Sequence, residues 1–531
     1  MSATVQPAPS LLEELAAIVG HEHVLTDAAD LEFYSTDAYS RGAMPLAVLR
    51  PGTPAEVERV VAAVTAAGRS LVPRGGGASY TEGYLPREQE SLLIDTSRLD
   101  RIVEINETDM YATVEAGVTW AKLHAALAER GLRTPVFGPF SGIAATIGAS
   151  ISQHCVSWGT GVFGVSADSV LGVDVVLGNG GTLKTGSDAT RGTPPFFRHY
   201  GPDLTGLFTG DVGALGIKTR VTLRLLRKPP HHLGLSFRFP DFEHMAQGMV
   251  AAARLGVNTL NFGLDPRLQQ GQLGKAGKAA AIEAAAAVFR SSRSWLDGSR
   301  QVLRMAAAGR RFLGPEHFSA NYVVEGLDLP SVRSSAAALR EALAPFGAET
   351  ANTIPNVVYA MPFAPLHNML GPRGERWVPV HGLLPFSRVA GFRRALMQLY
   401  ESRAAEMREH RVDYGAMFMT VSTHAFLYEP VFYWEDERNA CHERMVPSDY
   451  LATLPVYPPN PGGRALVAEM KRQIIELLHE HGATHFQIGK VYPYLDDRDP
   501  VAVALLQAIK TAVDPARRMN PGALGLDAPA R

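Results

Sequence analysis

Three glycine-rich clusters in the N-terminal half constrain the fold of this chain more than any other feature. The first is "PRGGGAS" around Gly75, the second lies within residues 138–177, and the third is "TGDVGALGIKT" at 209–219. Glycine has no side chain, so the backbone of such a turn can approach a ligand closely and its N–H groups can bind an anion. Three clusters in one region therefore indicate a long ligand that contains phosphate, such as a dinucleotide.

The common nucleotide-binding motifs do not occur here in the context that defines them. No G-x-G-x-x-G opens a helix in a βαβ unit with an acidic residue about twenty positions later, and no glycine-rich loop ends in G-K-[ST]. The expected dinucleotide must therefore be bound by a different fold from the ones that these motifs define.

Capping signals and periodicity predict an α/β arrangement around the clusters. Ser10 and Glu13 form a capping box before an apolar-periodic run, and Thr53 with Pro54 begins a second helix that Gly68 ends. A third helix is expected over 119–131. Strands are expected over 91–99, 110–117 and 213–226, with a hairpin over 170–186.

The length of 531 residues predicts more than one domain. We expect a first domain at 1–230, a second at 231–465, and a C-terminal segment at 466–531 that returns to the first domain. The boundary is placed at "RKPPHH", residues 227–232, and the Pro- and Gly-rich tail at 511–526 is expected to lie as extended chain against another element.

Composition excludes several classes of protein. The net charge of −2 gives no reason to expect nucleic acid as a partner, and two cysteines, Cys155 and Cys441, cannot form a disulfide framework. The N-terminus lacks a signal-peptide pattern, so a cytoplasmic location is expected. The alanine-rich basic segment 274–314 is expected to be a helix with a solvated face; docking to an acidic redox partner or an anionic membrane surface is the alternative.

The glycine-rich stretches, in this order and spacing, resemble the vanillyl-alcohol-oxidase/para-cresol-methylhydroxylase superfamily of flavoproteins. The resembling segments are "VPRGGGASY", "TIGASISQH", "WGTGVFGVSADSVLGVDVVLGNGGTLKTG", "GDVGALGI" and "DPARRMNPG". The resemblance implies an α+β fold, with a two-subdomain FAD-binding domain and a mixed α/β substrate domain, or cap. The cap resembles the glycolate-oxidase and cresol-hydroxylase types.

The resemblance also assigns residues to FAD, which would explain the three consecutive glycines. They lie on the glycine-rich turns, on their flanks and in the tail: Pro73, Arg74, Gly75, Gly76, Gly77, Ala78, Ser79, Tyr80, Pro139, Thr146, Ile147, Gly148, Ala149, Ser152, His154, Gly159, Gly161, Gly164, Gly216, Ile217 and Asn520.

Departures from the family pattern sharpen these expectations. The positions that carry a flavin-linking His or Cys in relatives are Ala78 and the Ala144–Ala145 pair here, so noncovalent FAD is favoured; His424 and Tyr428 remain alternative attachment points. The phenolate-binding and base positions carry Ala78, Val165, Phe486 and Gln487. One histidine remains in each metal-binding segment of the hydroxy-acid branch, so no metal is expected.

We expect the catalytic residues to be His381, His485, Gln487 and Tyr428, with an imidazole taking the hydroxyl proton while hydride leaves the adjacent carbon. Tyr428 or Glu429 is expected to face the substrate. The expected function is that of an FAD-dependent oxidoreductase acting on an aromatic or lignin-derived alcohol. A 2-hydroxy acid dehydrogenase, a non-redox or carbon–carbon bond-forming flavoenzyme, and a noncatalytic flavin-binding protein are the alternatives.

The expected partners are the small-molecule alcohol and either oxygen or a separate electron acceptor. No nucleic acid or membrane surface is expected among them, and a homodimer is left open because dimers are common in the superfamily.

Overall fold

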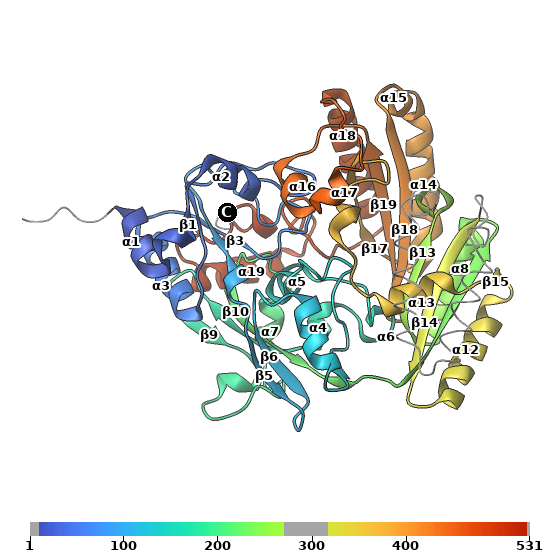
Figure 1. Cartoon of the computed structure of the whole chain (residues 1–531), viewed down its shortest axis with the longest axis horizontal. Coiled ribbons are helices and arrows are strands. Elements are labelled where there is room, and N and C mark those ends of the chain that lie inside the picture. The colour runs from blue at the N-terminus through green and yellow to red at the C-terminus, as the bar shows by residue number, and fades with distance from the viewer. Residues whose placement is uncertain (1–9, 270–316, 528–531) are drawn as a thin grey trace, which may run out of the picture.

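The computed structural model describes residues 10–269 and 317–527, and Figure 1 shows two N-terminal sheets beside one large C-terminal sheet. The basic segment predicted to be helical, 274–314, lies outside the described residues.

The first sheet has four strands in the order β1-β2-β4-β3, of which β2, β4 and β3 are parallel. The capping box predicted at Ser10 is present on α1, and Thr53 caps the helix that begins at Pro54, so both helix predictions are confirmed. The elements are α1 (Leu11–Val19), β1 (Val24–Leu25), α2 (Ala28–Tyr34), β2 (Ala47–Leu49), α3 (Pro54–Ala66), β3 (Leu71–Arg74) and β4 (Leu92–Asp95).

The second sheet is antiparallel, with the order β5-β6-β10-β8-β9. The predicted hairpin is formed by β8 and β9, and the predicted helix over 119–131 is α4, so these expectations are confirmed. The elements of this sheet and its helices are β5 (Ile102–Asn106), β6 (Tyr111–Glu115), α4 (Trp120–Ala128), α5 (Ile147–Gln153), α6 (Thr160–Phe163), β8 (Val170–Val176), β9 (Thr182–Lys184), α7 (Leu204–Leu207) and β10 (Ile217–Arg224). The short strands β7 (Leu132–Arg133) and β11 (Leu226–Arg227) pair with each other in a separate two-stranded sheet.

The cap is built on an eight-stranded sheet in the order β15-β12-β14-β13-β18-β19-β16, with β17 also paired to β19. One face of this sheet packs against its helices around Phe392, Phe418 and Tyr428, and the other face looks toward the N-terminal sheets. The strands are β12 (His231–Phe239), β13 (Asn258–Leu264), β14 (Phe318–Gly326), β15 (Ala348–Thr350), β16 (Arg376–Pro379), β17 (Gly382–Pro385), β18 (Val412–Val421) and β19 (Ala425–Trp434).

Among the described residues of this half, five helices pack on the outer side of the sheet (Figure 1): α8 (Phe242–Arg254), α12 (Leu329–Leu343), α14 (Val389–Ser402), α15 (Ala404–Glu409) and α18 (Pro461–Glu480). Three others in the same described part contact the N-terminal half: α13 (Thr353–Ala360), α16 (Ala440–Met445) and α17 (Ser448–Leu451).

The C-terminal segment returns to the first sheet after α19 (Pro500–Val513). The N–H of Leu71 donates to the carbonyl of Arg518, and the N–H of Asn520 donates to the carbonyl of Leu71. The tail is thereby fixed beside β3, directly before the first glycine cluster. This placement agrees with the expectation that the tail lies against another element.

Candidate flavin site and active site

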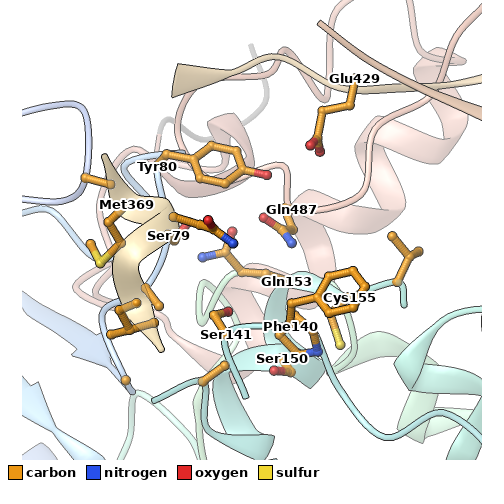
Figure 2. A pocket seen from close by; sticks show the side chains of 18 of the residues that line it. Ser79, Tyr80, Phe140, Ser141, Ser150, Gln153, Cys155, Met369, Glu429 and Gln487 are labelled. Carbon is orange, nitrogen blue, oxygen red and sulfur yellow. The ribbon is translucent and has the colours of Figure 1, made fainter. Parts of the chain in front are cut away.

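A cavity of about 310 Å³ lies between the glycine-rich turns and the inner face of the cap sheet. Figure 2 shows side chains of its lining, with Glu429 on the cap side and Ser141 and Ser150 on the opposite side. The N-terminal half contributes Gly75–Tyr80, Pro139–Ser141 and Gln153–Val156. The cap and the segment after it contribute Trp377, Met417, Met419, Leu427, Glu429, Val431, Tyr433, Phe486 and Gln487.

A smaller cavity of about 60 Å³ continues from the first one toward the third glycine cluster. Both cavities are lined by Gly75, Tyr84, Ala149 and Gln153, and the smaller one reaches Gly216. The glycine clusters therefore line adjoining parts of one trough. This is the arrangement that a long, phosphate-containing ligand needs.

The first two glycine clusters pack directly against each other. A Cβ added to Gly75 would lie 2.3 Å from Thr146 Oγ1, and one added to Gly76 would lie 1.8 Å from the carbonyl oxygen of Ala144. Side chains are therefore excluded by the neighbouring turn itself. The turn also leaves its donors unused: within the described chain, no acceptor is bonded to the backbone N–H groups of residues 75–80. Such a row of free donors fits a diphosphate.

Arg74 adds a positive charge beneath this turn. Its guanidinium carbon lies 4.4, 4.6 and 4.8 Å from the ring centroids of Phe33, Tyr34 and Tyr84, and the side chain is buried. No carboxylate of the described residues lies within ion-pair distance of it. A caged, unpaired cation beside free N–H donors is suited to an anionic ligand.

Several buried polar atoms around the trough lack a partner within the described structure. They include Thr146 Oγ1, His154 Nδ1 and Asn520 Oδ1, which all belong to residues that the sequence assigned to FAD. Buried polar atoms are normally hydrogen-bonded, so unpaired ones at a cavity suggest a missing ligand or water. Together with the free donors of residues 75–80, they fit an FAD molecule.

The residues that the sequence assigned to FAD fall into two groups. One group lines the two cavities: Pro73, Arg74, Gly75, Gly76, Gly77, Ala78, Ser79, Tyr80, Pro139, Gly148, Ala149, Ser152, His154, Gly216 and Ile217. The other group lies behind the lining: Thr146, Ile147, Gly159, Gly161, Gly164 and Asn520.

Two members of the second group illustrate how these residues support the trough. A Cβ on Gly159 would lie 1.9 Å from the carbonyl oxygen of Pro135, so this glycine serves chain packing. Asn520 donates from Nδ2 to the carbonyls of Gly83 and Val212, at 2.8 and 2.6 Å, and thereby ties the tail to two residues that line the smaller cavity.

Among the described residues that line the cavity of about 310 Å³, Glu429 is the acidic one. Its side chain is on β19 and buried, with no hydrogen-bond donor among the described residues, and burial raises the pKa of its carboxyl group to about 7. In Figure 2 the carboxylate points into the cavity, on the side of Gln487 and the Tyr80 hydroxyl. A carboxyl group with a pKa near neutrality can accept a proton at physiological pH.

The sequence analysis named Glu429 only as an alternative to Tyr428. The two residues are neighbours on one strand, so their side chains point to opposite faces of the sheet. Tyr428 is fully buried in the cap core, where its hydroxyl accepts a hydrogen bond from Arg393 Nη1 at 2.7 Å. The structure therefore does not bring Tyr428 to the cavity. The missed signal is that Glu429 is the one charged residue in the ten-residue strand Ala425–Trp434.

Gln487 lines the cavity, whereas His381 and His485 lie behind its wall. His381 Nε2 donates to the carbonyl of Phe486, and His485 Nδ1 donates to the carbonyl of His381 at 2.8 Å. Burial lowers the pKa of His381 to about 3 and that of His485 to about 4. Imidazoles with these pKa values are weak bases, so the geometry favours a positioning role for both.

The structure also locates residues that the sequence analysis considered for flavin attachment or phenolate binding. His424 lies exposed at the turn between β18 and β19, and Ala78 and Phe486 line the cavity. Within residues 10–269 and 317–527, no three His, Cys, Asp or Glu side chains are arranged to hold a metal ion. In the same ranges no helix combines the length and apolar character needed to cross a bilayer.

Comparison with known families agrees with an FAD-binding role for the trough. The model of the FAD binding domain matches residues 45–186, and the model of the C-terminal domain of FAD linked oxidases matches residues 467–524. The fold and site thus define an FAD-linked protein with an FAD-binding domain. These two matches agree with the resemblance to the vanillyl-alcohol-oxidase/para-cresol-methylhydroxylase superfamily that the sequence indicates.

Relatives of known name share part of the chain. The glycolate oxidase subunit GlcD of Bacillus subtilis is 31% identical over 259 residues, which are 48% of this chain and 53% of that protein. The mitochondrial D-lactate dehydrogenase [cytochrome] of Arabidopsis thaliana is 31% identical over 214 residues, or 40% and 36% of the two chains. The matches thus span about half the length of these relatives or less.

Solved structures share the fold over nearly the whole chain. p-Cresol methylhydroxylase with bound substrate superposes with a TM-score of 0.70 at 18% identity, covering 97% of this chain and 96% of the other. The 4-ethylphenol oxidase of Gulosibacter chungangensis gives 0.69 at 17% identity, with the same coverage. The expected fold class, an FAD-binding domain followed by a mixed α/β domain, is confirmed.

Proposed function

We propose that this protein is an FAD-dependent oxidoreductase that removes hydride from the carbon bearing the hydroxyl group of a small, neutral aromatic alcohol. The carrying observation is the composition of the cap half of the cavity, where one titratable carboxyl group, Glu429, is set among apolar and aromatic side chains. Aromatic and methionine side chains such as Trp377, Met417 and Met419 suit an aromatic ring.

The N-terminal half of the trough would hold FAD. The free N–H groups of residues 75–80 and the caged charge of Arg74 would bind the diphosphate, and Gln487 would lie beside the flavin ring. When bound, FAD supplies the two-electron acceptor for hydride, and the protein supplies orientation and a base. Oxygen or a separate acceptor would take up the electrons in a later step.

Glu429 would act as the base. The carboxylate form takes the hydroxyl proton of the substrate as hydride leaves the adjacent carbon, so charge does not build up on the oxygen. A pKa of about 7 leaves a useful fraction of carboxylate at neutral pH while keeping the group basic enough to accept the proton. The surrounding Tyr80 and Tyr433 rings restrict water around this group.

A 2-hydroxy acid is the second candidate substrate, because relatives that share half of the chain are a glycolate oxidase subunit and a D-lactate dehydrogenase by name. A carboxylate substrate needs a cation or several donors in a buried site. None of the described residues that line the larger cavity is Lys or Arg, and its charged carboxylate would repel an acid. The lining therefore favours the neutral alcohol.

The test is anaerobic reduction of the purified yellow protein by two matched panels, aryl alcohols such as 4-hydroxybenzyl alcohol and 2-hydroxy acids such as D-lactate. We expect bleaching of the flavin absorbance by the alcohols at least tenfold faster than by the acids. Faster bleaching by the acids would overturn the substrate class, and a colourless protein without extractable flavin would overturn the proposed function as a whole.

We also propose that FAD is held without a covalent bond. Ala78 lines the cavity at a linking position of relatives, while His424 is exposed and Tyr428 is in the cap core. Acid precipitation is expected to leave the yellow colour in the supernatant. Colour that stays with the pellet after washing would contradict this proposal.

A further inference from the structure

A third cavity, of about 630 Å³, lies in the cap. Its outer residues are open to solvent, with side-chain exposures of 71% for Arg373 and Arg411 and 52% for Asp413. Its floor is buried, as shown by Glu375 at 1% and Tyr400 at 3% exposure. This cavity therefore leads from the surface into the cap.

One face of the cap sheet contributes residues to both cavities, and the outer cavity also extends to the opposite, helix-covered side of β18, where Tyr400, Met407 and Tyr414 line it. Along β19 and just beyond it, the alternate residues Glu429 and Val431 line the active-site cavity, and Glu435 lines the outer cavity. Along β18, Met417 lines the active-site cavity and Asp413 the outer one. Because alternate residues of a strand share one face, the outer cavity continues the same surface on which the proposed base is located.

Tyr433 lines both cavities and therefore forms the wall between them. On β19, Tyr433 is the next residue after Val431 whose side chain lies on the same face of the sheet. Its partner on β18 is Asp413. The next residue of β18 on this face is Gly415, which is paired with Val431 and has no side chain. Leu268 and Asp265, from the segment after β13, pack over Gly415. The side chain that β18 and β19 themselves place at this point of the barrier is therefore the Tyr433 ring.

We infer that the outer cavity is the vestibule through which the substrate reaches the flavin site, and that Tyr433 is the gate that limits the size of the aromatic molecule that passes. This inference rests on the proposed function, because it concerns access to the same site. Tyr433 has two rotatable side-chain bonds, so a turn of its ring is sufficient to join the two cavities.

The charges of the vestibule suit a neutral molecule. The described residues of its lining include four arginines and four acidic residues, so the formal charges of these residues balance. Arg267 pairs with Asp413 at 2.9 Å, Arg373 with Glu375 at 2.6 Å, and Arg411 with Glu435 at 2.6 Å. Because these arginines are already paired, they do not offer a strong site for an anion. Tyr414, stacked on Tyr400 at 3.9 Å between ring centroids, lines the outer cavity on the opposite, helix-covered side of β18.

Labelling of an introduced thiol tests the passage without requiring turnover. In the flavin-loaded protein, Val431→Cys places a thiol on the active-site side of Tyr433, and benzyl methanethiosulfonate serves as a neutral aromatic probe. Mass spectrometry of the peptide that contains position 431 gives the labelling rate, and the peptide of the buried Cys441, which lines neither cavity, serves as the internal reference. Adding Tyr433→Ala to this background is expected to raise the rate at least tenfold.

Matched variants separate a gate from a general loosening of the fold. Tyr433→Phe keeps the ring and should label at the wild-type rate, Tyr200→Ala removes a tyrosine that is 70% exposed elsewhere and should have no effect, and Asp413→Trp should slow labelling by filling the vestibule. If Tyr433→Ala loses flavin, Tyr433→Leu replaces it.

Unchanged labelling in both the Ala and Leu variants, or equal acceleration by Tyr200→Ala, would overturn the inference. The readout is independent of catalysis, so a protein that reduces its flavin with none of the alcohols could still show the gate. Conversely, alcohol-dependent bleaching with unchanged labelling would support the proposed function and refute the gate.

Discussion

The two halves of the active-site cavity are built in different ways. The N-terminal half presents backbone: free N–H groups over residues 75–80, glycines packed against the next turn, and one caged arginine. The cap half presents side chains from separate strands, with Glu429 among Met417, Met419 and Trp377. A site made of backbone requires glycine at fixed places, whereas a site made of side chains depends on which strands come together.

The glycine half should be the less tolerant of change. Gly76→Val would place a Cβ 1.8 Å from the Ala144 carbonyl oxygen, so the two turns could no longer pack. We expect loss of bound flavin and a decrease of about 3 kcal/mol or more in the free energy of unfolding, measured by visible absorbance and urea denaturation.

Gly391→Ala is the matched control, because a Cβ there meets its nearest atom at 3.4 Å on the surface helix α14. This variant should keep its flavin and its stability. A yellow, stable Gly76→Val protein would show that the packing of the turns does not hold the cofactor.

In the cap half, Glu429→Gln should have the largest effect on chemistry. The amide keeps the size of the side chain and removes the base, so we expect the rate of anaerobic flavin reduction to fall by about 10²–10⁴-fold while flavin stays bound. Glu435→Gln is the control and should change this rate less than threefold. Glu435 follows Val431 and Tyr433 on the same face of the sheet. Equal rates in wild type and Glu429→Gln would remove the base from the proposal.

The two histidines behind the cavity wall, His381 and His485, should affect the rate of flavin reduction less than Glu429 does. His485→Ala removes a hydrogen bond to the His381 carbonyl and a ring stacked at 4.1 Å on Tyr492. We expect a loss of about 1–2 kcal/mol in unfolding free energy and less than a tenfold fall in flavin reduction, with the pH at half-maximal rate unchanged. A fall comparable to that of Glu429→Gln would restore His485 as the base.

Tyr428→Phe should have the smallest kinetic effect. Its hydroxyl faces the cap core and accepts a hydrogen bond from Arg393, so its loss should cost about 1–2 kcal/mol of stability and change the reduction rate less than twofold. Thermal unfolding and stopped-flow absorbance measure the two effects. A large kinetic defect without loss of stability would place Tyr428 in the site after all.

The same contrast explains what could be predicted from the sequence. The capping residues Ser10 and Thr53, the hairpin of β8 and β9 and the glycine turns depend on local chemistry, so they could be read directly. The positions of the cap residues could not be predicted from the sequence in this way. Whether Tyr428 or Glu429 faces the cavity depends on which face of β19 the helices cover, and this is a property of the assembled sheet.

The histidines show the same limit. His381 and His485 were predicted as bases because imidazole ordinarily titrates near neutrality. Burial behind Tyr80 and Tyr492 lowers their pKa values to about 3 and 4, while burial of Glu429 raises its pKa to about 7. Only the packed structure shows that burial changes the order of basicity among these three groups.

The pH dependence of anaerobic flavin reduction by a saturating aryl alcohol tests the assignment of Glu429 most directly. The base must be ionised to act, so the wild-type rate should rise with pH, reach half of its maximum near pH 7 and be about tenfold below its plateau at pH 6. Glu429→Gln should be slow and flat over the same range. A wild-type rate that does not change between pH 6 and 8, or a Glu429→Gln variant that keeps the rise, would contradict the account.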